Sequence, residues 1–99
     1  MNNIIQVEPV IDNSELEELK KIINSRYVTE HDLTEQFENI TADYTNSKYA
    51  ISLCNGTCAL FCALKAINIK RGDEVLVPNI TFISTATAVL LAGAKVKLV

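Results

Sequence analysis

The turn at residues 53–60 is the best candidate for binding an anion. It joins an apolar run, which predicts a strand, to a stretch rich in Ala and Leu, which predicts the start of a helix. The first amides of a helix lack intrahelical partners, and with the helix dipole they attract anions. Gly56 permits close approach, and the Thr57 hydroxyl and the amides of Thr57 and Cys58 can donate hydrogen bonds to phosphate oxygens. These residues predict a phosphate site; the alternative is that Asn55 or Thr57 only caps the helix.

A second candidate is Phe82, which lies just beyond a predicted strand at residues 74–77 that Pro78 closes. Ligands of open α/β sheets bind at the carboxyl ends of the strands. The turn at Thr57 follows another predicted strand and should lie at the same edge. Phe82 could therefore face a planar ring whose phosphate is bound at Thr57; the alternative is an ordinary core aromatic.

The sequence gives little support for a nucleotide-binding loop or a catalytic site. Neither the P-loop pattern nor the dinucleotide-binding glycine pattern occurs in the sequence. His31 is expected to be solvated, and Asp73 and Glu74 resemble a surface turn. No nucleophile–base pair can be assembled, so we assign no catalytic residue within this chain.

Three cysteines, Cys54, Cys58 and Cys62, recur every four residues and should lie near one helical face. A metal or cluster site is one interpretation. Small apolar packing residues are the favoured one, because no second ligand pair accompanies them. We therefore predict no metal site. The odd count indicates free thiols in a reducing compartment, and we expect a cytoplasmic protein.

Composition sets the broad class. The 99 residues are 48% hydrophobic, with a net charge of −3 and the two signs mixed, which favours a folded protein and gives no basic stripe for nucleic acid. The N-terminus lacks the pattern of a secretory signal. The longest apolar stretch, residues 86–94, is too short to span a bilayer. We expect neither nucleic acid nor membrane as a partner.

The pattern of residues 1–45 predicts a helical segment. Ser14 and Glu17 match a capping box for a first helix that ends near Ser25, with an extended stretch after it. Asp32 can cap a second helix, and Asn46 can end it. Apolar residues at helical spacing should form the buried stripes of both helices: Leu16, Leu19, Ile22 and Ile23, then Leu33, Phe37, Ile40 and Tyr44.

Residues 46–99 have a different pattern, in which short apolar strands alternate with helices. Strands are predicted at 49–53, 74–77 and 95–99, and helices at 57–67 and 81–92, with Gly93 suited to end the second helix. This β-α-β-α-β order predicts an α/β layered fold with a mostly parallel sheet. A sheet that ends on a strand lacks a following element to cover it, which suggests a truncated domain.

Four motifs together resemble the DegT/DnrJ/StrS sugar aminotransferases in order and spacing: NGTCAL at 55–60, RGDEVLVP at 71–78, TF at 81–82 and AGA at 92–94. The resemblance covers essentially the whole chain. It implies the three-layer fold of the fold type I aminotransferases that depend on pyridoxal 5'-phosphate (PLP), with residues 46–99 as the first part of the PLP-binding large domain. It also implies a homodimer that transfers an amino group, usually from glutamate, to a nucleotide-linked keto-sugar for surface polysaccharides, glycans or antibiotics.

By match of motif, Gly56, Thr57 and Cys58 would hold the cofactor phosphate and Phe82 would stack on the pyridine ring. Tyr27 and Thr29 correspond to a substrate-side segment of the family. The family's Schiff-base lysine lies beyond Val99, so we expect the 99 residues alone to be inactive.

Two alternatives stay open: a sugar dehydratase of the same fold, and an inactive truncated or regulatory protein. In this family later strands separate the first strand from the second, so we expect the isolated chain to aggregate or to be only partly ordered.

Overall fold

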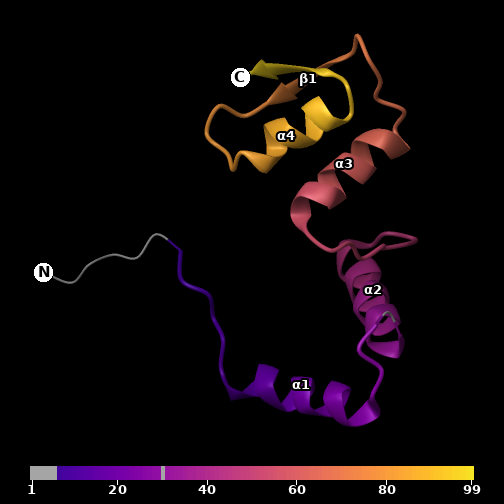
Figure 1. Cartoon of the computed structure of the whole chain (residues 1–99). Coiled ribbons are helices and arrows are strands. Elements are labelled where there is room, and N and C mark those ends of the chain that lie inside the picture. The colour runs from indigo at the N-terminus through magenta and orange to yellow at the C-terminus, as the bar shows by residue number, and fades with distance from the viewer. Residues whose placement is uncertain (1–6, 30) are drawn as a thin grey trace, which may run out of the picture.

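A computed structural model describes residues 7–29 and 31–99 and places six elements along an open arc (Figure 1). The first three are helices, a strand follows, and a helix and a strand complete the series: α1 (Asn13–Ser25), α2 (Asp32–Thr45), α3 (Gly56–Ala66), β1 (Glu74–Val77), α4 (Ser84–Leu91) and β2 (Lys95–Leu98).

The two strands form a parallel pair in which Glu74 lies opposite Lys95 and Val77 opposite Leu98. Helix α4 connects the two strands and packs against both, so β1-α4-β2 is a βαβ unit. Helix α3 packs along α4. The positive φ of +87° at Gly93 lets the chain leave α4 sharply and enter β2. The predicted second and third strands and the α/β order are therefore confirmed.

A small hydrophobic core lies inside this βαβ unit. Val77, Val89 and Ala94 are buried at its centre, and Leu64 of α3 is among the half-buried residues that pack around them. Val77 is 1% exposed and Val89 is 2% exposed, so these two side chains mark the centre of the core. Through this core, α3 and the turn before it are positioned relative to the sheet.

The predicted first strand does not form within the described residues. Residues 49–53 are outside any strand, and Tyr49 and Ile51 are 73% and 79% exposed. A strand needs a neighbour to pair its backbone groups, and β1 and β2 pair only with each other here. The prediction of a buried strand at 49–53 is wrong for the chain as it stands, and the reason is the absence of a partner.

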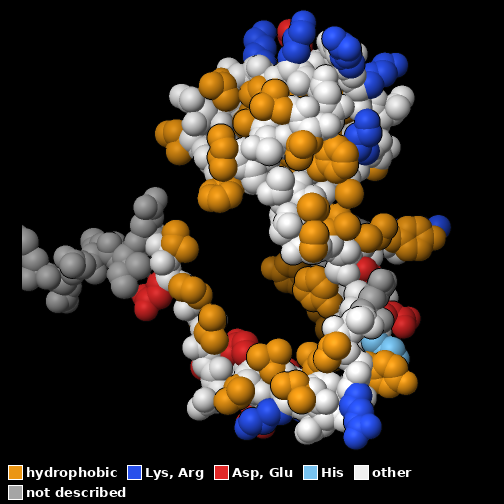
Figure 2. Space-filling view, viewed as in Figure 1, with side chains coloured by type: hydrophobic (Ala, Val, Ile, Leu, Met, Phe, Trp, Pro, Cys, Tyr) orange, Lys and Arg blue, Asp and Glu red, His pale blue; other side chains and the backbone are white. Residues whose placement is uncertain are grey.

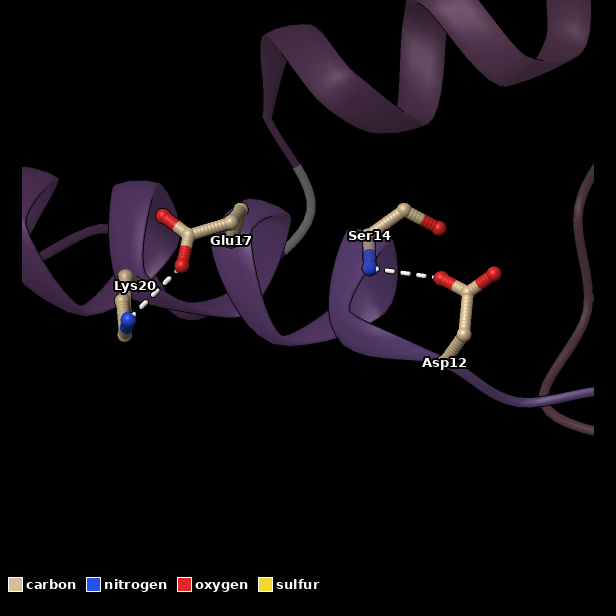
Figure 3. Close-up of polar contacts among 4 residues, drawn as sticks. All are labelled: Asp12, Ser14, Glu17 and Lys20. Atoms are coloured by element: carbon tan, nitrogen blue, oxygen red, sulfur yellow. Dashed lines mark hydrogen bonds and ion pairs between the residues drawn. The ribbon is translucent and has the colours of Figure 1, made fainter.

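Helices α1 and α2 are capped differently from expectation. Asp12, not Ser14, caps α1: its carboxylate accepts from the Ser14 amide at 2.7 Å, and Glu15 accepts from the Asp12 amide at 2.7 Å. Figure 3 shows the Asp12–Ser14 bond, together with an ion pair of 2.7 Å between Lys20 and Glu17. The capping box therefore begins two residues earlier than predicted.

His31 occupies the N-cap position of α2, without a side-chain capping bond, and Asp32 is the first helical residue. The predicted end of α2 is confirmed, since Asn46 adopts φ +52° and its amide donates back to the last turn. The extended stretch expected at residues 26–29 begins instead with Arg26 in the left-handed region, at φ +64°. Helix α4 starts at Ser84, three residues later than predicted.

The apolar stripes of α1 and α2 are not buried. The larger side chains of the α2 stripe are 48% to 91% exposed, with Phe37 at 60% and Tyr44 at 91%. Among the described residues, neither helix packs against another element. The orange side chains along both helices in Figure 2 face open space. The radius of gyration of 17.8 Å exceeds the value of about 13 Å expected for a compact chain of this length.

Within the described residues, no helix is long and apolar enough to cross a membrane.

Candidate functional site

The start of α3 contains the predicted phosphate site, and Asn55 determines its geometry. Asn55 is the N-cap residue with an extended backbone, and its Oδ1 accepts from the Cys58 amide at 2.9 Å. Its carbonyl also accepts from the Ala59 amide at 3.1 Å. The capping alternative is therefore correct for Asn55. The Cys58 amide, expected to face a phosphate, donates to Asn55 in this structure.

Two backbone donors and one hydroxyl remain at this helix start. The amides of Gly56 and Thr57 belong to the first turn, where no intrahelical acceptor exists. Gly56 is exposed, and a Cβ built on it would have no heavy atom within 4 Å. Thr57 is half-buried beside it. This donor set and the open space fit the oxygens of one phosphate group.

The thiols adjoin the same turn. Asn55 Nδ2 donates to the Cys54 sulfur at 3.4 Å, so the Asn55 amide group joins Cys54 to Cys58. A hydrogen bond with Cys54 and the proximity of that thiol raise the pKa of Cys58 above its usual range. All three cysteines are free, and no cluster of three metal-ligating side chains occurs in residues 7–29 and 31–99.

Phe82 lies in the connection between β1 and α4 and is 77% exposed. It borders a hollow of about 480 Å³ whose other lining residues include Pro78, Leu90 and Leu98. Gly56, Thr57 and Cys58 do not line this hollow. Phe82 therefore lies just before α4 and the turn lies at the start of α3; these two helices pack together, but no cavity joins Phe82 to the turn within the described residues.

Tyr27 and Thr29 lie together, in the connection between α1 and α2. Both line a hollow of about 560 Å³ between these helices. The Tyr27 ring stacks on His31, with centroids 4.6 Å apart and planes inclined by 19°. His31 Nδ1 lies 3.1 Å from the Asp32 carboxylate. The stack was missed in the sequence, where the only signal is two aromatic rings four residues apart.

A further contact joins the helical segment to the chain that leads into α3. Glu38 of α2 accepts hydrogen bonds from the Ser52 amide at 2.7 Å and from the Ser52 hydroxyl at 2.9 Å. These two bonds lower the pKa of the Glu38 carboxyl. Fourteen residues separate the partners, so no local pattern in the sequence predicts the contact. It fixes the path of the chain only three residues before Asn55.

Known proteins resemble the chain along nearly its full length. GDP-perosamine synthase of Escherichia coli O157:H7 is 34% identical over 95 residues, which cover 95% of this chain and 26% of that protein. The spore coat polysaccharide biosynthesis protein SpsC of Bacillus subtilis (strain 168) is 36% identical over 86 residues, which cover 87% of this chain and 22% of that protein. The chain thus spans about a quarter of the length of these relatives.

Solved structures of related enzymes also match the chain along nearly its full length. Spr1654 of Streptococcus pneumoniae in its PLP form matches 99% of this chain and 25% of its own, with a TM-score of 0.88 and 28% identity. The GDP-4-keto-6-deoxy-D-mannose-3-dehydratase of E. coli with bound hydrated PLP matches 100% of this chain and 27% of its own, with a TM-score of 0.84 and 26% identity.

These matches confirm the expected α/β fold of the PLP-dependent fold type I enzymes and PLP as the family's cofactor. Residues 9–99 match the sequence profile of one family. The chain belongs to the DegT/DnrJ/EryC1/StrS aminotransferase family.

Proposed function

We propose that the protein containing this chain is a PLP-dependent aminotransferase that moves an amino group from glutamate to a nucleotide-linked keto-sugar. Two relatives support a role in surface polysaccharide chemistry: one is a GDP-perosamine synthase and the other a spore coat polysaccharide biosynthesis protein. Residues 1–45 would form an N-terminal helical segment and residues 46–99 the first part of the PLP-binding large domain. The enzyme would work as a homodimer in the cytoplasm.

The observation that carries this proposal is the open start of α3. The amides of Gly56 and Thr57 and the Thr57 hydroxyl would donate to the cofactor phosphate, and the positive end of the helix dipole would favour its charge. Cys58 would contribute its thiol, because its amide is bound by Asn55. When bound, PLP supplies the electron sink that amino-group transfer requires.

Phe82 would contact the pyridine ring of PLP, and Tyr27 would contact the sugar nucleotide. The ring of Phe82 is exposed just beyond the carboxyl end of β1. It could therefore stack on the pyridine ring without disturbing the hydrophobic core. Tyr27 and Thr29 present a phenol and a hydroxyl to the hollow between α1 and α2, which suits the hydroxyl groups of a sugar nucleotide.

The test uses the full-length protein. After incubation with PLP and removal of free cofactor, it is mixed with glutamate and a GDP-linked 4-keto-6-deoxy sugar. Mass spectrometry should detect an amino-sugar nucleotide and an equal amount of 2-oxoglutarate. A protein that retains PLP but forms neither product with a panel of GDP-, UDP- and TDP-linked keto-sugars would refute the aminotransferase assignment.

A dehydratase is the second candidate, since a dehydratase that acts on a GDP-linked keto-sugar has the same fold over this whole chain. The same assay separates the two reactions. The aminotransferase reaction consumes glutamate in stoichiometric amount, and its sugar product gains an amino group. The dehydratase product instead loses the oxygen of one hydroxyl group.

A further inference from the structure

Two cysteines flank the turn that leads into α3, and the proposed function does not use them as a pair. Cys54 is exposed and lies outside the helix, immediately before the capping residue Asn55. Cys58 is half-buried in the first turn of α3, and Cys62 is exposed one turn further along. The expectation from sequence was that these residues are packing groups, but none of the three is buried.

The side chain of Asn55 holds Cys54 against the first turn of the helix. Its Nδ2 donates to the Cys54 sulfur at 3.4 Å, and its Oδ1 accepts from the Cys58 amide at 2.9 Å. The two ends of one amide group therefore contact both cysteines. The neighbouring Cys54 thiol raises the pKa of Cys58, by hydrogen bonding and by its charge when ionised. Cys54 is the more exposed of the two thiols, and its sulfur accepts a hydrogen bond from Asn55.

Cys62 is the natural comparison, because it also lies four residues from Cys58. Both are inside α3, where Cβ atoms at this spacing lie about 5–6 Å apart. A disulfide needs Cβ atoms about 3.5–4.5 Å apart, so a bond between Cys58 and Cys62 would have to distort the helix. Cys54 is free of this constraint, since its backbone precedes the helix. The geometry singles out the pair of Cys54 and Cys58.

We infer that Cys54 and Cys58 form a reversible disulfide across the start of α3 when the protein meets a hydroperoxide. The Cys54 thiol gives up its proton and the thiolate attacks one peroxide oxygen; the O–O bond breaks, the leaving oxygen takes up that proton, and a sulfenic acid and water (or an alcohol) result. The Cys58 thiol then attacks the sulfenic sulfur, the S–O bond breaks, and water leaves with the Cys58 proton. The two thiols lose two electrons in total, and the peroxide gains them.

The disulfide would act on the phosphate site; this consequence rests on the proposed function. Bonding of the Cys54 sulfur to Cys58 moves it away from Asn55 Nδ2, which now donates to it, and the Asn55 side chain shifts with the loss of that partner. The Cys58 amide then loses its cap, and the Gly56–Thr57 turn that would donate to the phosphate changes shape. Loss of one or two charge-assisted hydrogen bonds should weaken PLP binding by about tenfold or more. The pair is therefore a redox switch on cofactor affinity.

Disulfide mapping of the full-length protein tests the pair directly. Trypsin leaves all three cysteines in one peptide, residues 49–65, because no Lys or Arg lies between them. After hydrogen peroxide treatment, iodoacetamide should label only Cys62 in this peptide, and a second alkylating reagent added after dithiothreitol should label Cys54 and Cys58. Labelling of all three thiols in the first step, or a linkage that includes Cys62, would overturn the inference.

PLP affinity, followed by the absorbance of the bound cofactor, tests the consequence. The dissociation constant should rise about tenfold or more on oxidation and return with dithiothreitol. The oxidant should have no such effect in Cys54→Ser, whereas the matched Cys62→Ser should respond like the original protein. A mapped disulfide without a change in PLP affinity would refute the switch. A reduced protein that does not bind PLP would refute the proposed function, while the mapping would still decide whether the pair exists.

Discussion

The Glu38 carboxylate of α2 binds both the amide and the hydroxyl of Ser52, at 2.7 and 2.9 Å. Both hydrogen bonds reach the same carboxylate oxygen, and they connect the helical segment to the irregular stretch that enters α3. No element of the βαβ unit packs against α1 or α2 within the described residues. The relative position of the two parts of the chain therefore depends strongly on this side chain.

Glu38→Gln should loosen the connection, because a neutral amide is a weaker acceptor than a carboxylate. We expect the Ser52 amide to exchange its hydrogen severalfold faster, measured by hydrogen–deuterium exchange with mass spectrometry or NMR. Glu35→Gln is the matched control, since Glu35 is exposed on the same helix and makes none of the side-chain bonds described here. Equal exchange rates in the two variants would show that the bond is not maintained in solution.

The same bond should depend on pH. The hydrogen bonds from Ser52 lower the pKa of folded Glu38 below its ordinary value in the unfolded chain. The stabilisation is therefore fully present above the unfolded pKa and is lost as the pH falls through the folded pKa. An NMR titration of the Glu38 side-chain carboxyl carbon should show a lower midpoint in the folded protein than in the unfolded protein. Coincident midpoints would contradict the bond.

Asn55→Ala removes the cap of α3 and should cost about 1 kcal/mol of stability in the full-length protein, as caps of this kind do. PLP affinity should fall as well, since the first turn would no longer be held in shape. Asn55→Asp retains an acceptor for the Cys58 amide and should keep most of the stability, although its charge would repel a phosphate. Denaturant unfolding and PLP titration measure the two effects separately, and an Ala variant as stable as the original would exclude the cap.

Gly56→Ala separates folding from binding. Gly56 lacks a positive φ and has open space around it, so an added methyl group should leave stability unchanged or raised by up to about 1 kcal/mol. The same methyl group would project where the phosphate must approach, and PLP affinity should fall by at least about tenfold, as when a charge-assisted bond is lost. Gly93→Ala is the contrasting variant, because φ +87° makes it costly to folding. Undiminished PLP affinity in Gly56→Ala would place the phosphate elsewhere.

Phe82→Ala should weaken PLP binding with little loss of stability, because the ring is 77% exposed. A stacked aromatic pair contributes about 0.5–1.5 kcal/mol beyond its buried area, which corresponds to a several-fold change in affinity. Phe82→Tyr should retain binding, and Ile80→Ala, at 95% exposure, should have no effect. Equal PLP affinity in the two alanine variants would remove Phe82 from the site.

The isolated 99-residue chain should bind a hydrophobic dye and unfold without a sharp transition. Large side chains such as Ile51 and Tyr44 are 79% and 91% exposed, and the core centred on Val77 and Val89 is small. Exposed apolar surface on this scale favours association. Dye fluorescence and scanning calorimetry are the measurements. A soluble monomer with a cooperative thermal transition would contradict the expectation.

Local patterns in the sequence predicted the elements whose causes are local. Short apolar runs placed β1 and β2, the Ala- and Leu-rich run placed α3, and Asn46 and Gly93 were identified as helix ends because few residues tolerate positive φ. The helix caps were less well predicted, since Asp12 and Ser14 are both good N-cap residues and residue type alone does not select between them.

The sequence by itself determined the family, the α/β order and the turn at Gly56, because these depend on residue types at fixed spacing. Only the tertiary structure decided which groups meet: Glu38 with Ser52, the Asn55 amide with both Cys54 and Cys58, and Tyr27 with His31. It also decided that residues 49–53 remain unpaired, since a strand forms only where a second strand satisfies its backbone hydrogen bonds. Contacts across many residues follow from the path of the whole chain, which no short window of sequence contains.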